Sequence, residues 1–149
     1  MATKDNENLH TQIGDQLRSG GHRYTTGRRR VVTALLRAGA PVTIPQLLMV
    51  DDGLTQSSTY RNLVILEEVG VATRVVTFDD HVRYELHEHL TTHHHHLMCT
   101  GCGNVADFEL SESLERTLER EMQQASKQAK FKVSGHRLDY FGTCAACSS

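Results

Sequence analysis

Four cysteines in two C-x2-C pairs constrain this 149-residue chain more than any other feature. Cys99 and Cys102 follow a run of four histidines, and Cys144 and Cys147 lie near the C-terminal end. Two such pairs supply four thiolates at the spacing of a closed tetrahedral zinc site. Because the N-terminal residues contain no apolar signal region, we expect a cytoplasmic protein with reduced thiols, and structural zinc rather than disulfides.

The histidine run, His93 to His96, adds ligands of a second kind. If the run is extended, His93 and His95 share one face while His94 and His96 share the other, so one strand can supply two further metal sites. A zinc deaminase also combines C-x-x-C with a histidine. Its signature requires proline before the first cysteine, whereas Met98 stands before Cys99 here, which excludes that class.

The net charge of −2 conceals a basic segment. Residues 16–50 contain no aspartate or glutamate but six arginines: Arg18, Arg23, Arg28, Arg29, Arg30 and Arg37. Such a stretch in a nearly neutral protein is typical of a surface for a polyanion, although a solvated helix face has the same composition. The apolar segments are too short to span a membrane, so we expect no membrane association.

After a polar N-terminal stretch, three helices are expected before residue 70. Thr25 and Thr26 can cap a helix that ends at Gly39, and Thr43 can cap a short helix over 46–50. A third helix begins near residues 56–58 and ends at Gly70. The periodicity then changes to two, which predicts strands over 72–78 and 82–86. Helix-turn-helix followed by a hairpin predicts a winged helix.

The start of the third helix carries the residues expected to contact DNA. Ser57 and Ser58 are small enough for a close approach to base edges, Tyr60 can contact a thymine methyl group, and Arg61 can bind a phosphate. Partial burial in the helix packing is the alternative for Tyr60. Arg23 and Arg28 are expected to contact phosphates or the minor groove.

The C-terminal part predicts a different unit. Strands are expected over 93–98, 104–108 and 131–141, with a helix over 111–128 whose Leu114, Leu118 and Met122 share one face. Because this part is too small for a full core, that face is expected to pack against a second copy. The predicted fold is α+β: a winged helix-turn-helix DNA-binding domain at residues 1–87 and a zinc-binding α/β dimerisation domain at 88–149.

The order of these features resembles the ferric uptake regulator (Fur) superfamily of metal-responsive repressors. The resemblance covers nearly the whole chain, and its most specific part is the segment from His93 to Gly103. The other matching segments are Thr25–Arg28, Ser58–Leu63, Tyr84–Leu86, Gly135–Leu138 and Gly142–Cys147.

The resemblance implies three metal sites. The four cysteines correspond to the family's closed structural zinc site. A second site corresponds to His93, His95, Glu115 and His136, and a hinge site, implied to sense the regulatory metal, corresponds to Glu85, His94 and His96.

The loop before the histidine run departs from the family pattern. It is about two residues longer than is usual in the family and contains His87 and His89, either of which can substitute as a hinge ligand; we include His87 in the predicted hinge site. Pro41 stands where iron- and peroxide-sensing members often have a histidine, and His22 is a candidate replacement. Imidazoles with a carboxylate suit several divalent cations, so Fe²⁺ or Zn²⁺ is expected as regulatory metal. The resemblance favours iron, because zinc-sensing members of the family often add a cysteine to the hinge site and all four cysteines here belong to the closed site.

The resemblance implies a homodimeric repressor that binds A·T-rich palindromic operators when metal occupies the hinge. A peroxide sensor on the same scaffold is the main alternative, disfavoured by Pro41 and by the absence of a spare cysteine. A metal-dependent hydrolase using His87-Glu88-His89 is disfavoured because that segment lacks the H-E-x-x-H spacing. We therefore expect a regulator and not an enzyme.

Overall fold

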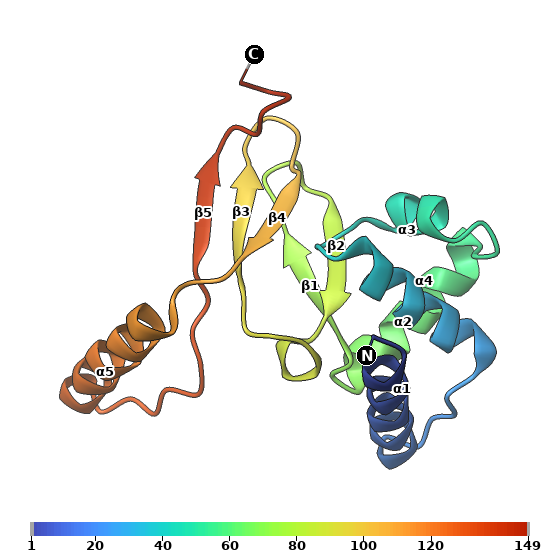
Figure 1. The fold of residues 1–149 in the computed structure, drawn as a ribbon, viewed down its shortest axis with the longest axis horizontal. Helices are drawn as coiled ribbons and strands as arrows, with labels where there is room; N and C mark the ends of the chain where they lie inside the picture. The colour runs from blue at the N-terminus through green and yellow to red at the C-terminus, as the bar shows by residue number, and fades with distance from the viewer. Residues whose placement is uncertain (1, 149) are drawn as a thin grey trace.

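The computed structural model describes residues 2–148, and Figure 1 shows their arrangement. The chain begins with four helices: α1 (Ala2–Ser19), α2 (Thr26–Ala38), α3 (Ile44–Val50) and α4 (Gln56–Glu68). A hairpin of β1 (Ala72–Val76) and β2 (Val82–Leu86) follows, and then a short 3-10 turn, η1 (Glu88–Leu90). The remaining elements are β3 (His95–Cys99), β4 (Val105–Phe108), α5 (Glu112–Ala129) and β5 (Asp139–Gly142). The fold is α+β, as predicted.

The polar N-terminal stretch, to which we assigned no helix or strand from the sequence, forms α1. Leu9, Ile13 and Leu17 recur every four residues, which places them on one face, and Ile13 and Leu17 are completely buried. His10 Nδ1 lies 2.5 Å from the Tyr24 hydroxyl and fixes α1 to the loop before α2. The four-residue spacing of these apolar side chains is the sequence feature from which this helix could have been predicted.

Helices α2 to α4 form the predicted helix-turn-helix, and local chemistry sets their ends. The Thr25 hydroxyl accepts a hydrogen bond from the Arg28 amide, and Gly39 ends α2 in the left-handed conformation at φ 64°. Thr43 and Gln46 form a reciprocal capping box at the start of α3. These capping residues explain why the ends of α2 and α3 could be predicted from the sequence.

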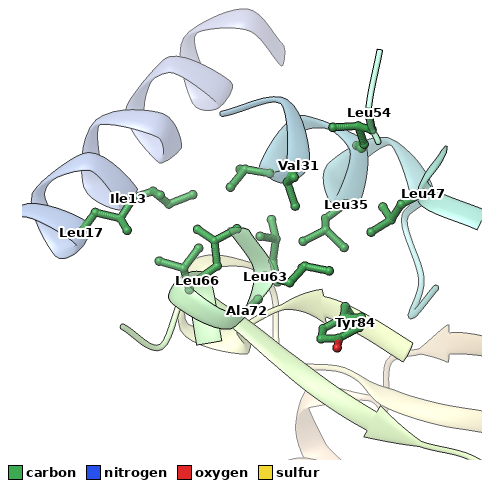
Figure 2. Packing of buried hydrophobic residues seen from close by; sticks show 14 residues of the cluster. Ile13, Leu17, Val31, Leu35, Leu47, Leu54, Leu63, Leu66, Ala72 and Tyr84 are labelled. Carbon is green, nitrogen blue, oxygen red and sulfur yellow. The ribbon is translucent and has the colours of Figure 1, made fainter. Parts of the chain in front are cut away.

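One hydrophobic core joins α1 to α4 and the hairpin, as the close view in Figure 2 shows. Val31 and Leu35 of α2 meet Leu63 and Leu66 of α4, and Leu47 fills the side toward α3. Strand β1 pairs antiparallel with β2, and Val42 adds a bridge to Tyr84 on the outer side of β2. Helices and wing are therefore one packed unit.

The C-terminal sheet has the strand order β4-β3-β5. Strand β3 pairs antiparallel with β4 and parallel with β5, with Cys99 opposite Gly142. The expected strand over 131–141 was too long, because only Asp139–Gly142 pair with β3. The parallel pairing brings the C-terminal cysteines beside the first pair, since both strands end at the same edge.

The hairpin also packs against this second sheet. Val75 of β1 is completely buried with Met98 and Val105, and the Phe78 ring meets Phe141 edge to face at 4.8 Å between centroids. Helix α5 instead projects away from the rest of the protein (Figure 1), and none of its described residues is buried. Within residues 2–148, no helix has both the length and the hydrophobicity of a membrane span.

Candidate metal centres

The four cysteines converge at the end of the C-terminal sheet. Cys99 ends β3, Cys102 follows in the turn, and Cys144 and Cys147 lie in the turns after β5. Their Sγ atoms all lie within 4.8 Å of one another, Cys102 and Cys144 are 3.7 Å apart, and all four are free thiols. Two sulfurs on one tetrahedral zinc ion are separated by roughly 3.8 Å. The four side chains therefore fit zinc and form no disulfide.

Backbone donors prepare this cluster for a cation. The amides of Cys144 and Cys102 donate to Cys99 Sγ and lower the pKa of that thiol to about 6. The hydrogen bond that Cys147 shares with Cys102 raises the pKa of Cys147 to about 12. One sulfur is thus readily a thiolate, while a further deprotonation in the crowded cluster requires a positive charge.

A second cluster contains His93, His95, Glu115 and His136, with one ligand atom of each within 4.8 Å of the others. His95 Nε2 lies 2.6 Å from Glu115 Oε1, and His136 Nε2 lies 3.3 Å from Glu115 Oε2. The hydrogen bond from His95 lowers the pKa of Glu115. Helix α5, although exposed, thus directs a charged carboxylate at three imidazoles, and the four residues predicted for this site come together.

The third cluster connects the two sheets. Glu85 of β2 lies 3.0 Å from His94 Nε2 and 3.2 Å from His96 Nε2 through the same oxygen, Oε2. Asp107 of β4 completes the group, 3.8 Å from His94 and 3.9 Å from His96. Two imidazoles and two carboxylates form a ligand set for a borderline divalent cation.

Burial and charge act against each other at the third cluster. Burial raises the pKa of Glu85, but hydrogen bonds from His96 and His94 outweigh it, so the pKa lies below its ordinary value. Burial lowers the pKa of His94 and His96, but their hydrogen bonds, to Thr92 and Glu85 and to Glu85 and Asp139 respectively, leave both pKa values raised. Burial raises the pKa of Asp107. A cation would replace protons that the metal-free cluster holds tightly.

Hydrogen bonds on the outer ring nitrogens orient the imidazoles. His94 Nδ1 lies 2.8 Å from the carbonyl oxygen of Thr92, which only accepts, so Nδ1 carries a proton. In the neutral ring Nε2 then has its lone pair directed at the cluster. His96 Nδ1 is held in the same way by Asp139, at 3.2 Å, and His93 Nδ1 by Glu88, at 2.8 Å.

Asp107, Glu88 and Asp139 were missed from the sequence. Asp107 lies directly opposite His96 in the β3–β4 pairing. The only sequence feature that could have indicated this ligand is an aspartate in the short strand that follows the first cysteine pair. Asp139 lies opposite His96 on the other side. Their partners depend on strand register, which the sequence did not provide.

Two expected hinge ligands do not belong to the Glu85 cluster, although His87 lines the same cavity as Glu85, His94 and His96. Among the described residues, His87 is absent from the Glu85 cluster, where Asp107 stands instead, and its Nδ1 atom faces His89. His22 lies 3.6 Å from Glu68 on α4. Pro41 is buried next to the Val42 bridge. The third cluster thus draws its ligands from β2, β4 and the histidine run.

The residues expected to contact DNA gather on the helical unit. Tyr60 is 52% exposed and Arg61 is exposed near the start of α4, so Tyr60 is not a core residue. Ser57 is exposed, while the Ser58 hydroxyl is 2.8 Å from that of Thr55. Arg23 is exposed before α2. Arg28 is half-buried and donates to the Arg23 carbonyl, which makes it a support for the loop.

Sequence comparison agrees with these features. Residues 19–141 match the ferric uptake regulator family. The chain is 31% identical over 150 aligned residues to the ferric uptake regulation protein of Bacillus subtilis, covering 95% of this chain and 96% of that protein. It is also 28% identical to the peroxide operon regulator of the same organism, covering 90% of each.

Solved structures share the fold. The ferric uptake regulator of Helicobacter pylori matches with a TM-score of 0.73 at 24% identity, covering 97% of this chain and 94% of that one. A zinc-bound manganese uptake regulator matches with a TM-score of 0.62 at 26% identity, covering 89% and 98%. With most of its length matched by the family and a relative above 30% identity, the chain belongs to the ferric uptake regulator family.

Proposed function

We propose that this protein is a metal-dependent transcriptional repressor that controls metal homeostasis genes. One observation carries the proposal: a single oxygen of Glu85, on the wing, accepts hydrogen bonds from both His94, just before β3, and His96, within β3 of the other sheet. Because the cluster contains ligands from both parts of the protein, a metal ion bound there would affect the position of the winged helix relative to the C-terminal sheet. The relatives named as ferric uptake regulation proteins support regulation by metal.

The proposed switch is a shift between conformations of the chain. In the metal-free protein, Glu85 is held only by protonated imidazoles, so the bonds between wing and C-terminal sheet loosen as the histidines lose their protons. A bound divalent cation supplies a fixed positive charge that does not leave at neutral pH. Glu85, His94, His96 and Asp107 would then hold one geometry, which selects the conformation that matches DNA.

We assign the DNA surface to α4 and the loop before α2. Ser57, Ser58 and Tyr60 would read base edges in the major groove, while Arg61 and Arg23 would bind phosphates. Arg30 forms an ion pair with Asp51, so it contributes less to that surface. Two copies related by a two-fold axis would recognise an A·T-rich palindrome, because half-sites mirror the symmetry of the dimer.

We assign the dimer contact to residues 88–149 and the DNA-binding domain to residues 1–87. Leu97 and Tyr140 on the C-terminal sheet and Leu114 and Met122 on α5 are between 43% and 53% exposed, although they are apolar. A second copy would bury them. The four cysteines would hold structural zinc in this domain, and the Glu115 cluster would bind a second ion. We propose a cytoplasmic location, which the free thiols and the proposed DNA target support.

Metal-dependent DNA binding tests the proposal. Fluorescence anisotropy on a palindromic A·T-rich duplex would compare protein with Fe²⁺ under anaerobic conditions, with Zn²⁺, and with a chelator that leaves cysteine-bound zinc in place. We expect either cation to increase affinity at least tenfold, and Glu85→Ala to abolish the increase. Glu121→Ala is the matched control, because Glu121 is exposed on α5 and paired only with Arg120 at 3.9 Å among the described contacts.

Equal affinity with and without the chelator would overturn the switch. The peroxide-regulator relatives provide a second arm of the experiment. Release of DNA by peroxide, with oxygen added to a histidine of the Glu85 cluster, would assign redox sensing to the same scaffold.

A further inference from the structure

His87 and His89 form a pair outside the three clusters described above. They flank Glu88 at η1, where the chain passes from the wing to the C-terminal sheet. Their Nδ1 atoms are 2.8 Å apart and their ring centroids 4.6 Å apart, and His89 is exposed. Two nitrogens that bind one tetrahedral zinc ion at about 2.0–2.1 Å are separated by roughly 3.3 Å, so a shift of about 0.5 Å between the two rings would give the pair the spacing of a chelate.

A chain of hydrogen bonds fixes the tautomer of His89. Gln16 Nε2 donates to the carbonyl oxygen of Val69 at 2.5 Å, which orients the Gln16 amide. Gln16 Oε1 must then accept the 3.1 Å bond from His89, so Nε2 of His89 carries the proton. In the neutral ring Nδ1 of His89 therefore has a free lone pair.

His87 presents a lone pair to the same point. Its Nδ1 atom accepts a hydrogen bond from the backbone amide of His89 at 3.4 Å, because His87 caps η1. Two nitrogens thus face each other across 2.8 Å, a distance at which either a proton or a metal cation must lie between them.

We propose that His87 and His89 form an additional binding site for a borderline divalent cation such as Zn²⁺. Two imidazoles from the chain leave the other coordination positions to water, which predicts a weaker and more exchangeable site than a closed cluster. Gln16 is a positioning residue, since its amide holds His89 in the binding tautomer, as second ligand shells do in metal proteins.

The location of the site suggests its effect. Gln16 lies on α1, and Val69 ends α4, so a cation on His89 would strengthen the connection from η1 through α1 to the end of the proposed recognition helix. We expect metal at this pair to increase DNA affinity after the Glu85 cluster is filled. This effect on DNA rests on the proposed function, whereas the existence of the site does not.

Zinc titration of the full-length protein tests the site. Native mass spectrometry and competition with a chromophoric chelator would count bound Zn²⁺ and measure its affinity. We expect the double variant His87→Gln/His89→Gln to bind one zinc ion fewer per chain, and Gln16→Leu to weaken that ion by roughly tenfold or more. His81→Gln is the matched control, because His81 is also a surface histidine, and it should bind as many zinc ions as the wild type.

Nitrogen-15 NMR of the histidine rings distinguishes a prepared site from chance binding. In wild-type protein that holds zinc only at the four cysteines, His89 should carry its proton on Nε2, and added zinc should shift the Nδ1 signals of His87 and His89. Unchanged zinc stoichiometry in the double variant would overturn the site, as would an Nδ1-protonated His89. If Gln16→Leu does not fold, the zinc stoichiometry of the single variant His89→Gln tests the site instead, because the His89 side chain is exposed and its replacement should not affect folding.

The two proposals fail separately. If Glu85→Ala loses one zinc ion and the double variant His87→Gln/His89→Gln loses none, the additional site is contradicted and the proposed switch still stands. If the wild type binds DNA independently of metal, while the double variant binds one zinc ion fewer than the wild type, the switch is contradicted and the additional site still stands.

Discussion

Asp79, at the tip of the β1–β2 hairpin, lies directly against Gly103, in the turn of the first cysteine pair: a Cβ atom at Gly103 would be 2.1 Å from Asp79 Oδ2. The Asp79 carboxylate cannot easily move, because Arg83 donates to both of its oxygens at 2.8 Å and Arg83 is buried. The wing tip is thus fitted to the cysteine turn.

Gly103→Ala should therefore destabilise the zinc-loaded protein. Gly103 has φ +70°, so alanine would be strained as well as in contact with Asp79. We expect the free energy of unfolding to fall by about 1–3 kcal/mol, measured by denaturant titration. Gly135→Ala is the control, since a Cβ there meets no atom within 4 Å. Equal stability of the two variants would show that the wing does not depend on this contact.

Cys144→Ser should remove one zinc ion per chain. The serine hydroxyl is a poor ligand in a thiolate site, whereas the backbone amide that donates to Cys99 Sγ is retained, so the variant tests the side chain alone. Zinc content by mass spectrometry and near-ultraviolet circular dichroism would show loss of both metal and packing. Thr143→Ser, a neighbouring change outside the cluster, should keep full zinc content.

The metal-free protein should lose stability as the pH rises from 6 to 8. The pKa values of His94 and His96 are raised above 6.5, so their contribution is complete below pH 6.5 and is lost as the pH passes the raised values. The pKa of Glu85 is lowered below 4.5, so its contribution is complete above pH 4.5 and is lost as the pH falls through the lowered value. Stability from Glu85, His94 and His96 is thus greatest between pH 4.5 and 6.5, whereas the raised pKa of Asp107 makes its contribution favourable only at lower pH.

Thermal unfolding in a chelator across this pH range measures the effect, and Glu85→Gln should flatten the profile. Affinity for a divalent cation should change in the opposite direction and rise with pH, because ligand imidazoles must be neutral. A profile identical in wild type and Glu85→Gln would contradict the assignment.

Arg61→Ala should weaken DNA binding by a similar factor on all sequences and reduce the slope of log affinity against log salt by about one. Tyr60→Ala should instead reduce discrimination between operator and unrelated duplexes. Arg116→Ala on α5, which removes an exposed arginine paired with Glu112, should leave both quantities unchanged. If Arg61→Ala behaved like Arg116→Ala, α4 would not be the DNA-facing helix.

The sequence predicted those parts of the fold that local chemistry determines. Thr25, Gly39 and Thr43 set helix ends through their own caps, and the alternation in 82–86 made a hairpin strand evident. Helix α1 was missed because its apolar residues are few among polar ones. The strand over 131–141 was predicted too long because partners on β3, and not residue types, determine where β5 begins.

For the candidate sites, residue types identified most of the ligands, and spatial pairing determined how they are grouped. His93 to His96 divide between two clusters, as the alternation predicted. Asp107 and Asp139 join or support the Glu85 cluster only because they lie opposite His96 on its two neighbouring strands. His87 does not join that cluster because, at the start of η1, its Nδ1 atom faces His89.

The alternation of the histidine run also determines which insertions and deletions the chain can tolerate. A deletion of Leu97 or Met98 would move all four imidazoles to the opposite face, so each cluster would receive the ligands of the other, while β3 remained a strand. A change of length at 87–92 precedes the strand and leaves this pairing in place. Variation in length in descendants of this sequence should therefore accumulate before the run and be absent within it.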